Sequence, residues 1–132
     1  MKAIIFLALL ALSFCDKSDK RKTIAECAAE LLGKKNRALE GAGLVRYCYS
    51  RINVQLSRIA HEQFNGGKAV TINQLKPGDI VGFNNHDGKP QPGHVGIVLT
   101  KRMYIHCPSG KAVTIGLFGD YKNFMGGRNY ID

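Results

Sequence analysis

Acidic residues are scarce in this sequence: 10 Asp and Glu stand against 19 Lys and Arg, which gives a net charge of +9. Its four cysteines are too few for a small fold held together by disulfides, and it contains no internal repeat or low-complexity tract. With 45% hydrophobic and 22% charged residues among 132, a wholly disordered chain is excluded. We expect one domain of ordinary size that buries its own core without metal ions or crosslinks.

The excess of positive charge predicts an acidic partner. Nucleic acid, an anionic membrane surface and an anionic cell-wall polymer would all satisfy it. The basic residues are spread over segments 20–22, 34–37, 46–58 and 101–102, and no platform of stacking aromatic side chains accompanies them. A solvated basic surface explains this distribution, so nucleic acid is not expected as a partner.

The sequence has no apolar run of the roughly 20 residues that a membrane-spanning helix needs. Its longest, Ala3–Phe14, follows the basic residue Lys2 and precedes a strongly charged segment. This pattern is typical of a secretory signal peptide. We predict that residues 1–15 are removed after Cys15 and that residues 16–22 form a charged linker, with an uncleaved anchor or a lipidated Cys15 as alternatives. The mature chain is then secreted, to the periplasm or cell surface in a bacterium, and makes no membrane contact.

Three cysteines remain after such a cleavage, and an odd number leaves at least one thiol unpaired. Cys27 and Cys48 each lie in an apolar helical pattern, so both are expected to be small core residues. A disulfide between them stays open, because the sequence does not test its geometry.

The chain changes from helical to extended patterns near its middle. Apolar residues recur at helical spacing in 23–32, begin a second helix in 44–49 and allow a short third one in 57–64. The expected strands are 69–72, 80–83, 94–99, 103–107, 112–117 and an edge strand at 128–131. Helices first and an antiparallel sheet afterwards predict an α+β domain over residues 23–132.

The hairpin expected around Lys101 brings two histidines onto one face. Because side chains alternate along a strand, His94 and Gly96 point the same way, and this turn places His106 opposite Gly96. The two histidines are then diagonal neighbours, with Cβ atoms about 7 Å apart. Such a pair suits one imidazole acting as a base while the second orients it.

Two other interpretations of this histidine pair stay open. The two rings would also suit zinc if Cys107 or Asp87 supplied a further ligand. No His-Glu-x-x-His motif or spaced cysteine pair supports that alternative, however. The pair could also be two half-exposed surface histidines, as we expect for His61 and His86, which lack comparable partners.

Four short segments occur in one order along the chain: EGAGLVRYCY (40–49), LKPGDIV (75–81), GHVGIV (93–98) and YIH (104–106). In this order and spacing they resemble the NlpC-type cell-wall peptidases, papain-like enzymes that cut the peptide stems of peptidoglycan. The likeness runs from about Thr23 to the end of the chain. It implies a papain-like fold with N-terminal helices packed on an antiparallel β-sheet, peptidoglycan or muropeptides as partners, no metal or other cofactor, and a monomer.

The resemblance also implies a catalytic cysteine at the start of a helix, a general-base histidine on the first hairpin strand and an orienting polar residue on the second. His94 and His106 match the last two roles. The family's Asp-Cys-Ser-Gly pattern reads Glu40-Gly41-Ala42-Gly43 here, so Gly41 occupies the nucleophile position. The likeness also includes a segment from Arg58 to Gln63. The binding residues that the resemblance implies are Glu40, Ala42, Arg58 and Gly93.

Glycine at position 41 has no thiol, so neither a thiolate nor an acyl-enzyme can form there. Cys48 lies about 10 Å further along the same helix, and Cys107 points to the opposite face of its strand from His106. Neither is expected to replace the missing group. We therefore predict a secreted muropeptide endopeptidase of the Cys-His-His type that lacks its nucleophile and is inactive as written. It is either an engineered variant or a natural pseudoenzyme that binds peptidoglycan peptides or regulates active relatives.

A second departure from the family concerns the segment before Glu40. Family members usually have a longer loop there, containing Tyr and Gly, that helps to build the substrate site. This chain has the short basic stretch Lys34-Lys35-Asn36-Arg37 instead. The family's substrate preference is therefore not carried over.

Overall fold

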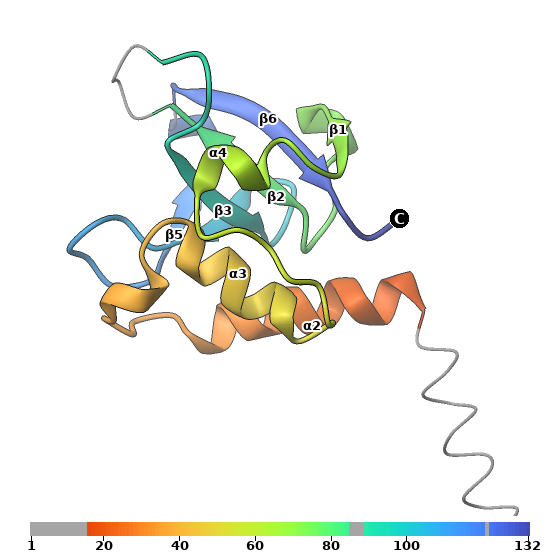
Figure 1. The fold of residues 1–132 in the computed structure, drawn as a ribbon, viewed down its shortest axis with the longest axis horizontal. Coiled ribbons are helices and arrows are strands. Elements are labelled where there is room, and N and C mark those ends of the chain that lie inside the picture. Colours follow the sequence, from red (N-terminus) through yellow and green to blue (C-terminus); the bar gives the residue numbers. More distant parts are fainter. Residues whose placement is uncertain (1–15, 85–88, 121) are drawn as a thin grey trace, which may run out of the picture.

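The computed structural model describes residues 16–84, 89–120 and 122–132 (Figure 1). The helical elements come first: α2 (Lys17–Glu30), the 3₁₀-helix η1 (Arg37–Leu39), α3 (Ala42–Ser50) and α4 (Ala60–Gln63). The strands are β1 (Lys68–Val70), β2 (Ile80–Phe83), β3 (His94–Val98), β4 (Met103–His106), β5 (Thr114–Leu117) and β6 (Phe124–Asn129). Two further 3₁₀-helices are η2 (Ile72–Gln74) and η3 (Phe118–Asp120).

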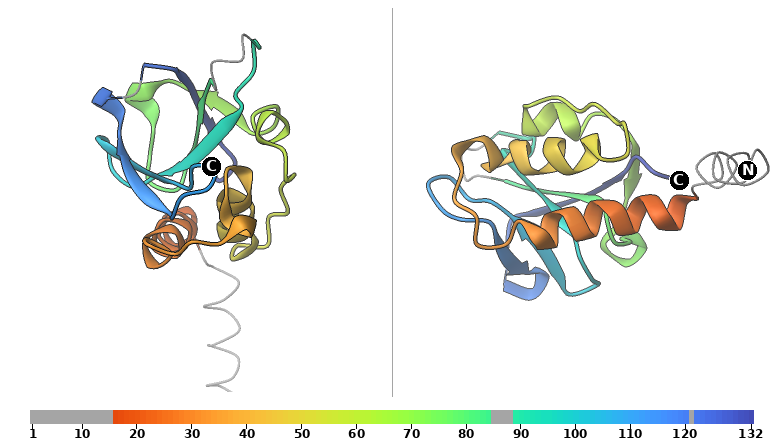
Figure 2. Two further views of the ribbon diagram at one scale, coloured as in Figure 1. Left: turned by 90° about the vertical axis from the view of Figure 1, so that its left-hand side faces the viewer. Right: turned by 90° about the horizontal axis from the view of Figure 1, so that it is seen from below.

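The described strands form one six-stranded sheet in the order β1-β6-β2-β3-β4-β5, and every neighbouring pair is antiparallel. Helices α2 and α3 pack beside each other and against β3. Figure 2 shows the twisted sheet with these two helices along one side of it. The predicted α+β architecture, with N-terminal helices on an antiparallel sheet, is therefore confirmed.

Helix α3 is held to the sheet by one apolar face. Leu44, Val45, Cys48 and Tyr49 are fully buried, whereas Tyr47 and Ser50 are exposed on the opposite side. These buried positions recur at the three- and four-residue spacing of a single helical face. Packing of this face fixes where α3 begins, next to the end of the β3–β4 hairpin.

Residues 17–22 are not a linker: they form the first turns of α2. The helix begins at the cap residue Asp16, whose Oδ1 accepts the backbone N–H of Asp19 at 2.9 Å. The apolar pattern that begins at Thr23 predicts that the helix starts there. In the structure Thr23 lies inside the helix, and its hydroxyl donates to the Asp19 carbonyl. Arg21, expected in the linker, is buried.

The C-terminal strand is longer and more central than the sequence predicts. The expected edge strand at 128–131 is β6, Phe124–Asn129, which pairs with both β1 and β2. Its Gly126-Gly127 pair is a weak strand signal, because glycine usually interrupts strands. A Cβ at Gly127 would lie 2.5 Å from Cδ2 of Leu75, so a larger residue there would require the Leu75 side chain to move.

The described residues contain no helix with the length and apolar character needed to cross a membrane. The predicted signal peptide, residues 1–15, lies outside the residues that the structure describes.

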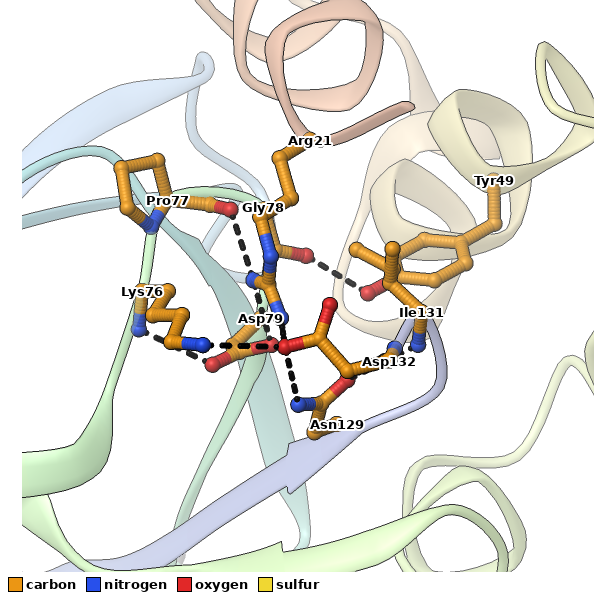
Figure 3. A network of polar contacts seen from close by, with 9 residues as sticks. All are labelled: Arg21, Tyr49, Lys76, Pro77, Gly78, Asp79, Asn129, Ile131 and Asp132. Atoms are coloured by element: carbon orange, nitrogen blue, oxygen red, sulfur yellow. Dashed lines mark hydrogen bonds and ion pairs between the residues drawn. The ribbon is translucent and has the colours of Figure 1, made fainter. Parts of the chain in front are cut away.

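A buried ion pair joins the start of α2 to the turn before β2 (Figure 3). Arg21 donates from Nη1 to the Pro77 carbonyl at 3.0 Å and to Asp79 Oδ1 at 2.9 Å. The second Asp79 oxygen accepts the Lys76 backbone N–H at 2.9 Å. The side chain of Asp79 is completely buried. Burial raises the pKa of Asp79, while the hydrogen bonds from Lys76 and Arg21 act in the opposite direction.

The same arginine also holds the last residue of the chain. Arg21 Nη2 donates to Asp132 Oδ2 at 2.9 Å, and Lys76 Nζ lies 3.0 Å from the same oxygen. These two hydrogen bonds lower the pKa of Asp132 below its ordinary value. The network thus ties together α2, the turn before β2 and the end of β6, which lie far apart in the sequence (Figure 3).

Candidate active site

The β3–β4 hairpin brings His94 and His106 into direct contact. Nε2 of His94 lies 2.8 Å from Nδ1 of His106. Ile97 pairs with Ile105, and this register continues to place Gly96 opposite His106. A Cβ at Gly96 would lie 3.2 Å from Cβ of His106, so glycine leaves the room in which the rings meet. The predicted proximity of the two imidazoles is confirmed.

Aromatic neighbours hold both imidazole rings. Phe83 lies against His94 with ring centroids 6.2 Å apart, and Tyr104 lies edge-on to His106 at 4.9 Å. Burial lowers the pKa of His94. Burial, and then the neighbouring His94, lower the pKa of His106 to about 4. At neutral pH both rings are therefore uncharged, and one donates a hydrogen bond while the other accepts it.

The atoms of this contact decide which nitrogen can react. His94 uses Nε2 toward His106, which leaves Nδ1 for a group in the cleft. The contact can be made by either of two tautomer pairs. In the pair where Nε2 of His94 carries the ring hydrogen, His94 donates to Nδ1 of His106, and its own Nδ1 is left able to accept a proton.

The histidine pair opens into a cleft of about 450 Å³. Its lining residues are Glu40, Gly41, Gly93, His94, His106, Pro108 and Ser109. Gly41 is the N-cap residue of α3, and its N–H donates to the Cys107 carbonyl at 2.8 Å. This hydrogen bond ties the tip of the helix to the end of β4, so position 41 and both histidines share one cleft.

The other predicted site residues fall into three places. Glu40 and Gly93 line the same cleft as the histidines. Ala42 is buried, and its carbonyl accepts Nε2 of Gln63 at 3.0 Å, which joins α3 to α4. Arg58 lies in a second groove, which shares only Glu40 with the cleft.

The sequence interpretation missed Pro108 and Ser109. Ser109 donates to Oε1 of Glu40 at 3.4 Å across the mouth of the cleft. The signal that points to them is the Pro-Ser-Gly turn directly after the histidine strand, since residues next to a site strand are placed beside the site.

Comparison with known protein families identifies the family of this chain. Residues 30–123 match the profile of the NlpC/P60 family over more than half of the chain. The chain belongs to the NlpC/P60 family. The likeness of the four sequence segments to NlpC-type peptidases is thereby confirmed.

Individual relatives of this NlpC/P60 chain are distant. Gamma-DL-glutamyl hydrolase of Bacillus subtilis (strain 168) is 31% identical over 75 residues, which are 56% of this chain and 18% of that protein. The structure of NlpC2 from Trichomonas vaginalis aligns with a TM-score of 0.76 and 26% identity, over 84% of this chain and 47% of that one. The chain thus spans less than half of either relative.

The peptidoglycan hydrolase RipB from Mycobacterium tuberculosis has the same fold. It aligns with a TM-score of 0.75 over 90% of this chain and 68% of its own, at 18% identity. The helices packed on an antiparallel sheet are therefore the papain-like NlpC/P60 architecture.

Position 41 of this NlpC/P60 chain has a backbone conformation suited to glycine. Its φ is 54° and its ψ is −121°, which residues with a Cβ rarely adopt. No heavy atom outside the adjoining residues lies within 4 Å of where a Cβ would stand. A cysteine there has the space it needs but bears a backbone cost of about 1–3 kcal/mol unless φ changes.

None of the three cysteines that the structure describes lines the histidine cleft. Cys27 and Cys48 are core residues, as predicted, and all three thiols are free. Burial raises the pKa of Cys48. Cys107 is fully buried and its thiol donates to the Lys111 carbonyl, 3.4 Å away. Burial also raises the pKa of Cys107, the opposite of what a nucleophile needs.

In the part of the chain that the structure describes, no group of three or more His, Cys, Asp and Glu residues could hold a metal ion. His86 and Asp87, considered as a surface residue and as a zinc ligand, lie outside the described residues. His61, expected at the surface, is half-buried in α4.

Acid is expected to destabilise the fold through the histidine pair. Both pKa values lie below the ordinary 6.5, and that of His106 is about 4. Between these values the unfolded chain binds more protons than the folded chain, so the free energy of unfolding falls as the pH drops from 6.5 toward 4. Urea denaturation across this range measures the slope. His106→Gln should flatten it, whereas His61→Gln should leave it unchanged, and equal slopes in all three proteins would contradict this assignment.

Proposed function

We propose that this chain has the substrate site and two of the three catalytic groups of a Cys-His-His muropeptide endopeptidase, and binds peptidoglycan peptides without cutting them. The observation that carries the proposal is the shared cleft. The His94–His106 pair opens beside Gly41 at the tip of α3. The sequence resemblance assigns the nucleophile to this position.

The geometry supports a role for each group. A thiol at position 41 would pass its proton to Nδ1 of His94, while His106 orients the His94 ring through its contact with Nε2. The positive end of the α3 dipole would favour a thiolate at position 41 and then the oxyanion of acyl transfer. With Gly41 no sulfur attacks the peptide carbonyl, so the peptide is held and released intact.

The names of the relatives support the class of substrate. One acts on gamma-DL-glutamyl bonds and another is a peptidoglycan hydrolase. Peptidoglycan stems carry free carboxylates, and the net charge, +9 for the whole sequence and +8 once Lys2 is removed with residues 1–15, favours their encounter with this chain. Such a substrate lies outside the cytoplasm, which agrees with the signal peptide proposed for residues 1–15. We propose that the secreted chain acts as a monomer.

A natural pseudoenzyme is the second candidate. The positive φ of Gly41 favours it, because glycine is the residue that adopts this conformation without strain. An engineered replacement of cysteine by glycine accounts for the intact histidine pair equally well.

Digestion of purified muropeptides, read by mass spectrometry, tests the proposal. The protein with Gly41 should leave the peptide stems intact, and the Gly41→Cys variant should cleave them. Gly41→Ala is the matched control, since it bears the same backbone cost without a thiol. If Gly41→Cys cleaves muropeptides and Gly41→Ala does not, the result supports an endopeptidase that has lost its nucleophile. If Gly41→Cys binds muropeptides without cleaving them, the result supports the pseudoenzyme. If neither variant binds or cleaves muropeptides, the proposal is wrong.

A further inference from the structure

We propose that a second groove, next to the histidine cleft, binds the free carboxylates of the peptide held there. We call it the arginine groove, after Arg37, Arg46 and Arg58, which line it together with Tyr47. It has a volume of about 480 Å³. The inference rests on the proposed function for the identity of the peptide, but the binding of carboxylates is tested independently of cleavage.

The three arginines come from three separate segments of the chain. Arg37 lies in η1, Arg46 on the outer face of α3, and Arg58 in the loop before α4. Gly43 brings the first two together, because a Cβ at this position would collide with the carbonyl of Ala38. The glycine lets η1 pack directly on α3. The cluster is thus built by tertiary packing.

These guanidinium groups have no acidic partner among the described residues. The ion pairs found there use Arg21, Lys22 and Lys76. Arg51 and Arg128, by contrast, donate to the Tyr47 hydroxyl and the Phe64 carbonyl. Three unpaired positive charges around one groove repel each other, and an anion between them relieves that repulsion.

One carboxylate, that of Glu40, lines the arginine groove. Its Oε1 accepts the Ser109 hydroxyl, which lies on the side of the histidine cleft. The groove therefore keeps an excess of positive charge. Planar guanidinium groups bind carboxylates through two parallel hydrogen bonds, which is why we assign a carboxylate rather than a neutral polar group to this groove.

Glu40 lines both cavities, so the groove and the cleft adjoin at this residue. A peptide with its reactive bond beside His94 can thus extend a neighbouring residue into the groove. In a γ-linked glutamyl peptide the side-chain carboxyl forms the peptide bond, so each such residue keeps its α-carboxylate free. This is the class of ligand that the arginine groove fits: a short peptide with free backbone carboxylates.

Titration of a fluorescent tetra-γ-glutamate peptide, followed by anisotropy, tests the proposal on the chain as written, which does not consume the probe. Replacing Arg37, Arg46 and Arg58 by glutamine should raise the Kd at least about tenfold. The control replaces Lys68, Lys101 and Arg102 by glutamine. These exposed residues lie outside both cavities, and the control has the same net charge. It should raise the Kd less than about threefold.

Three outcomes would overturn the inference: equal weakening in both triple variants, unchanged binding of the probe after methyl esterification, or equally tight binding of a phosphate oligomer of the same charge. Equal melting temperatures of the two variants establish that both are folded. If Gly41→Cys cleaves muropeptides equally well with and without the three arginines, the inference about the arginine groove is wrong and the proposed function is retained. If the arginines bind the probe but no variant cleaves or binds muropeptides, carboxylate binding by the arginine groove is supported and the proposed function is wrong.

Discussion

In the Gly41→Cys variant, replacing His94 by alanine is expected to lower kcat/KM for muropeptide cleavage by about 10³-fold. Nδ1 of His94 is the nitrogen that the His106 contact leaves for the cleft, so without it nothing takes the thiol proton. His106→Ala should cost less, about 10²-fold, because it removes the group that orients the base and leaves the base itself. Stopped assays of product by mass spectrometry measure both losses.

His61→Ala, made in the Gly41→Cys variant, supplies the control for this prediction. His61 lies in α4 and lines neither the cleft nor the arginine groove. We expect its kcat/KM to stay within about threefold of Gly41→Cys. A pH profile adds a second readout: His106→Ala should shift the acidic limb of kcat/KM, because the His94 ring loses the neighbour that lies 2.8 Å away. Full activity of the His94→Ala variant would show that another group is the base.

The second large effect concerns stability. Arg21→Met is expected to lower the free energy of unfolding by about 3–5 kcal/mol, the typical cost of leaving a buried charge without its partner. Asp79 is completely buried and would keep only the hydrogen bond from the Lys76 N–H, while Asp132 would lose one of its two cationic partners. Urea denaturation at pH 7 measures the change.

Two comparisons separate this effect from a general loss of charge on α2. Lys22→Met removes an exposed cation that lies 3.8 Å from Glu26, and should change stability by less than about 0.5 kcal/mol. The loss in Arg21→Met should also shrink at acid pH, because burial already raises the pKa of Asp79 and protonation removes its unpaired charge. A loss below about 1 kcal/mol in Arg21→Met would mean that the ion pair contributes little to stability.

The histidine pair was predictable because its geometry is local. A three-residue turn sets the register of the hairpin, and the alternation of side chains then decides which residues share a face. The absence of a thiol at position 41 is also visible in the sequence, but the assignment of this position to the nucleophile depends on the family resemblance and stays a prediction.

The local apolar pattern predicts a later start for α2 than the structure has. The spacing around Thr23 is a plausible helix start, yet the helix begins six residues earlier, at Lys17. Its early turns are stabilised by the pairing of Arg21 with Asp79, 58 residues away in the sequence. Such a partner is not encoded near the helix, so the charged segment by itself predicts a linker where the structure has the first turns of α2.

The α+β class, the hairpin with its two facing histidines and the lack of a thiol at position 41 can all be inferred from the amino-acid sequence alone. Each of these depends on residues close together in the chain. The central place of β6, the burial of Arg21 and the clustering of three arginines beside Glu40 became visible only in the folded chain. These features join segments far apart in the chain, and packing of the whole fold selects such contacts among many that the local sequence would allow.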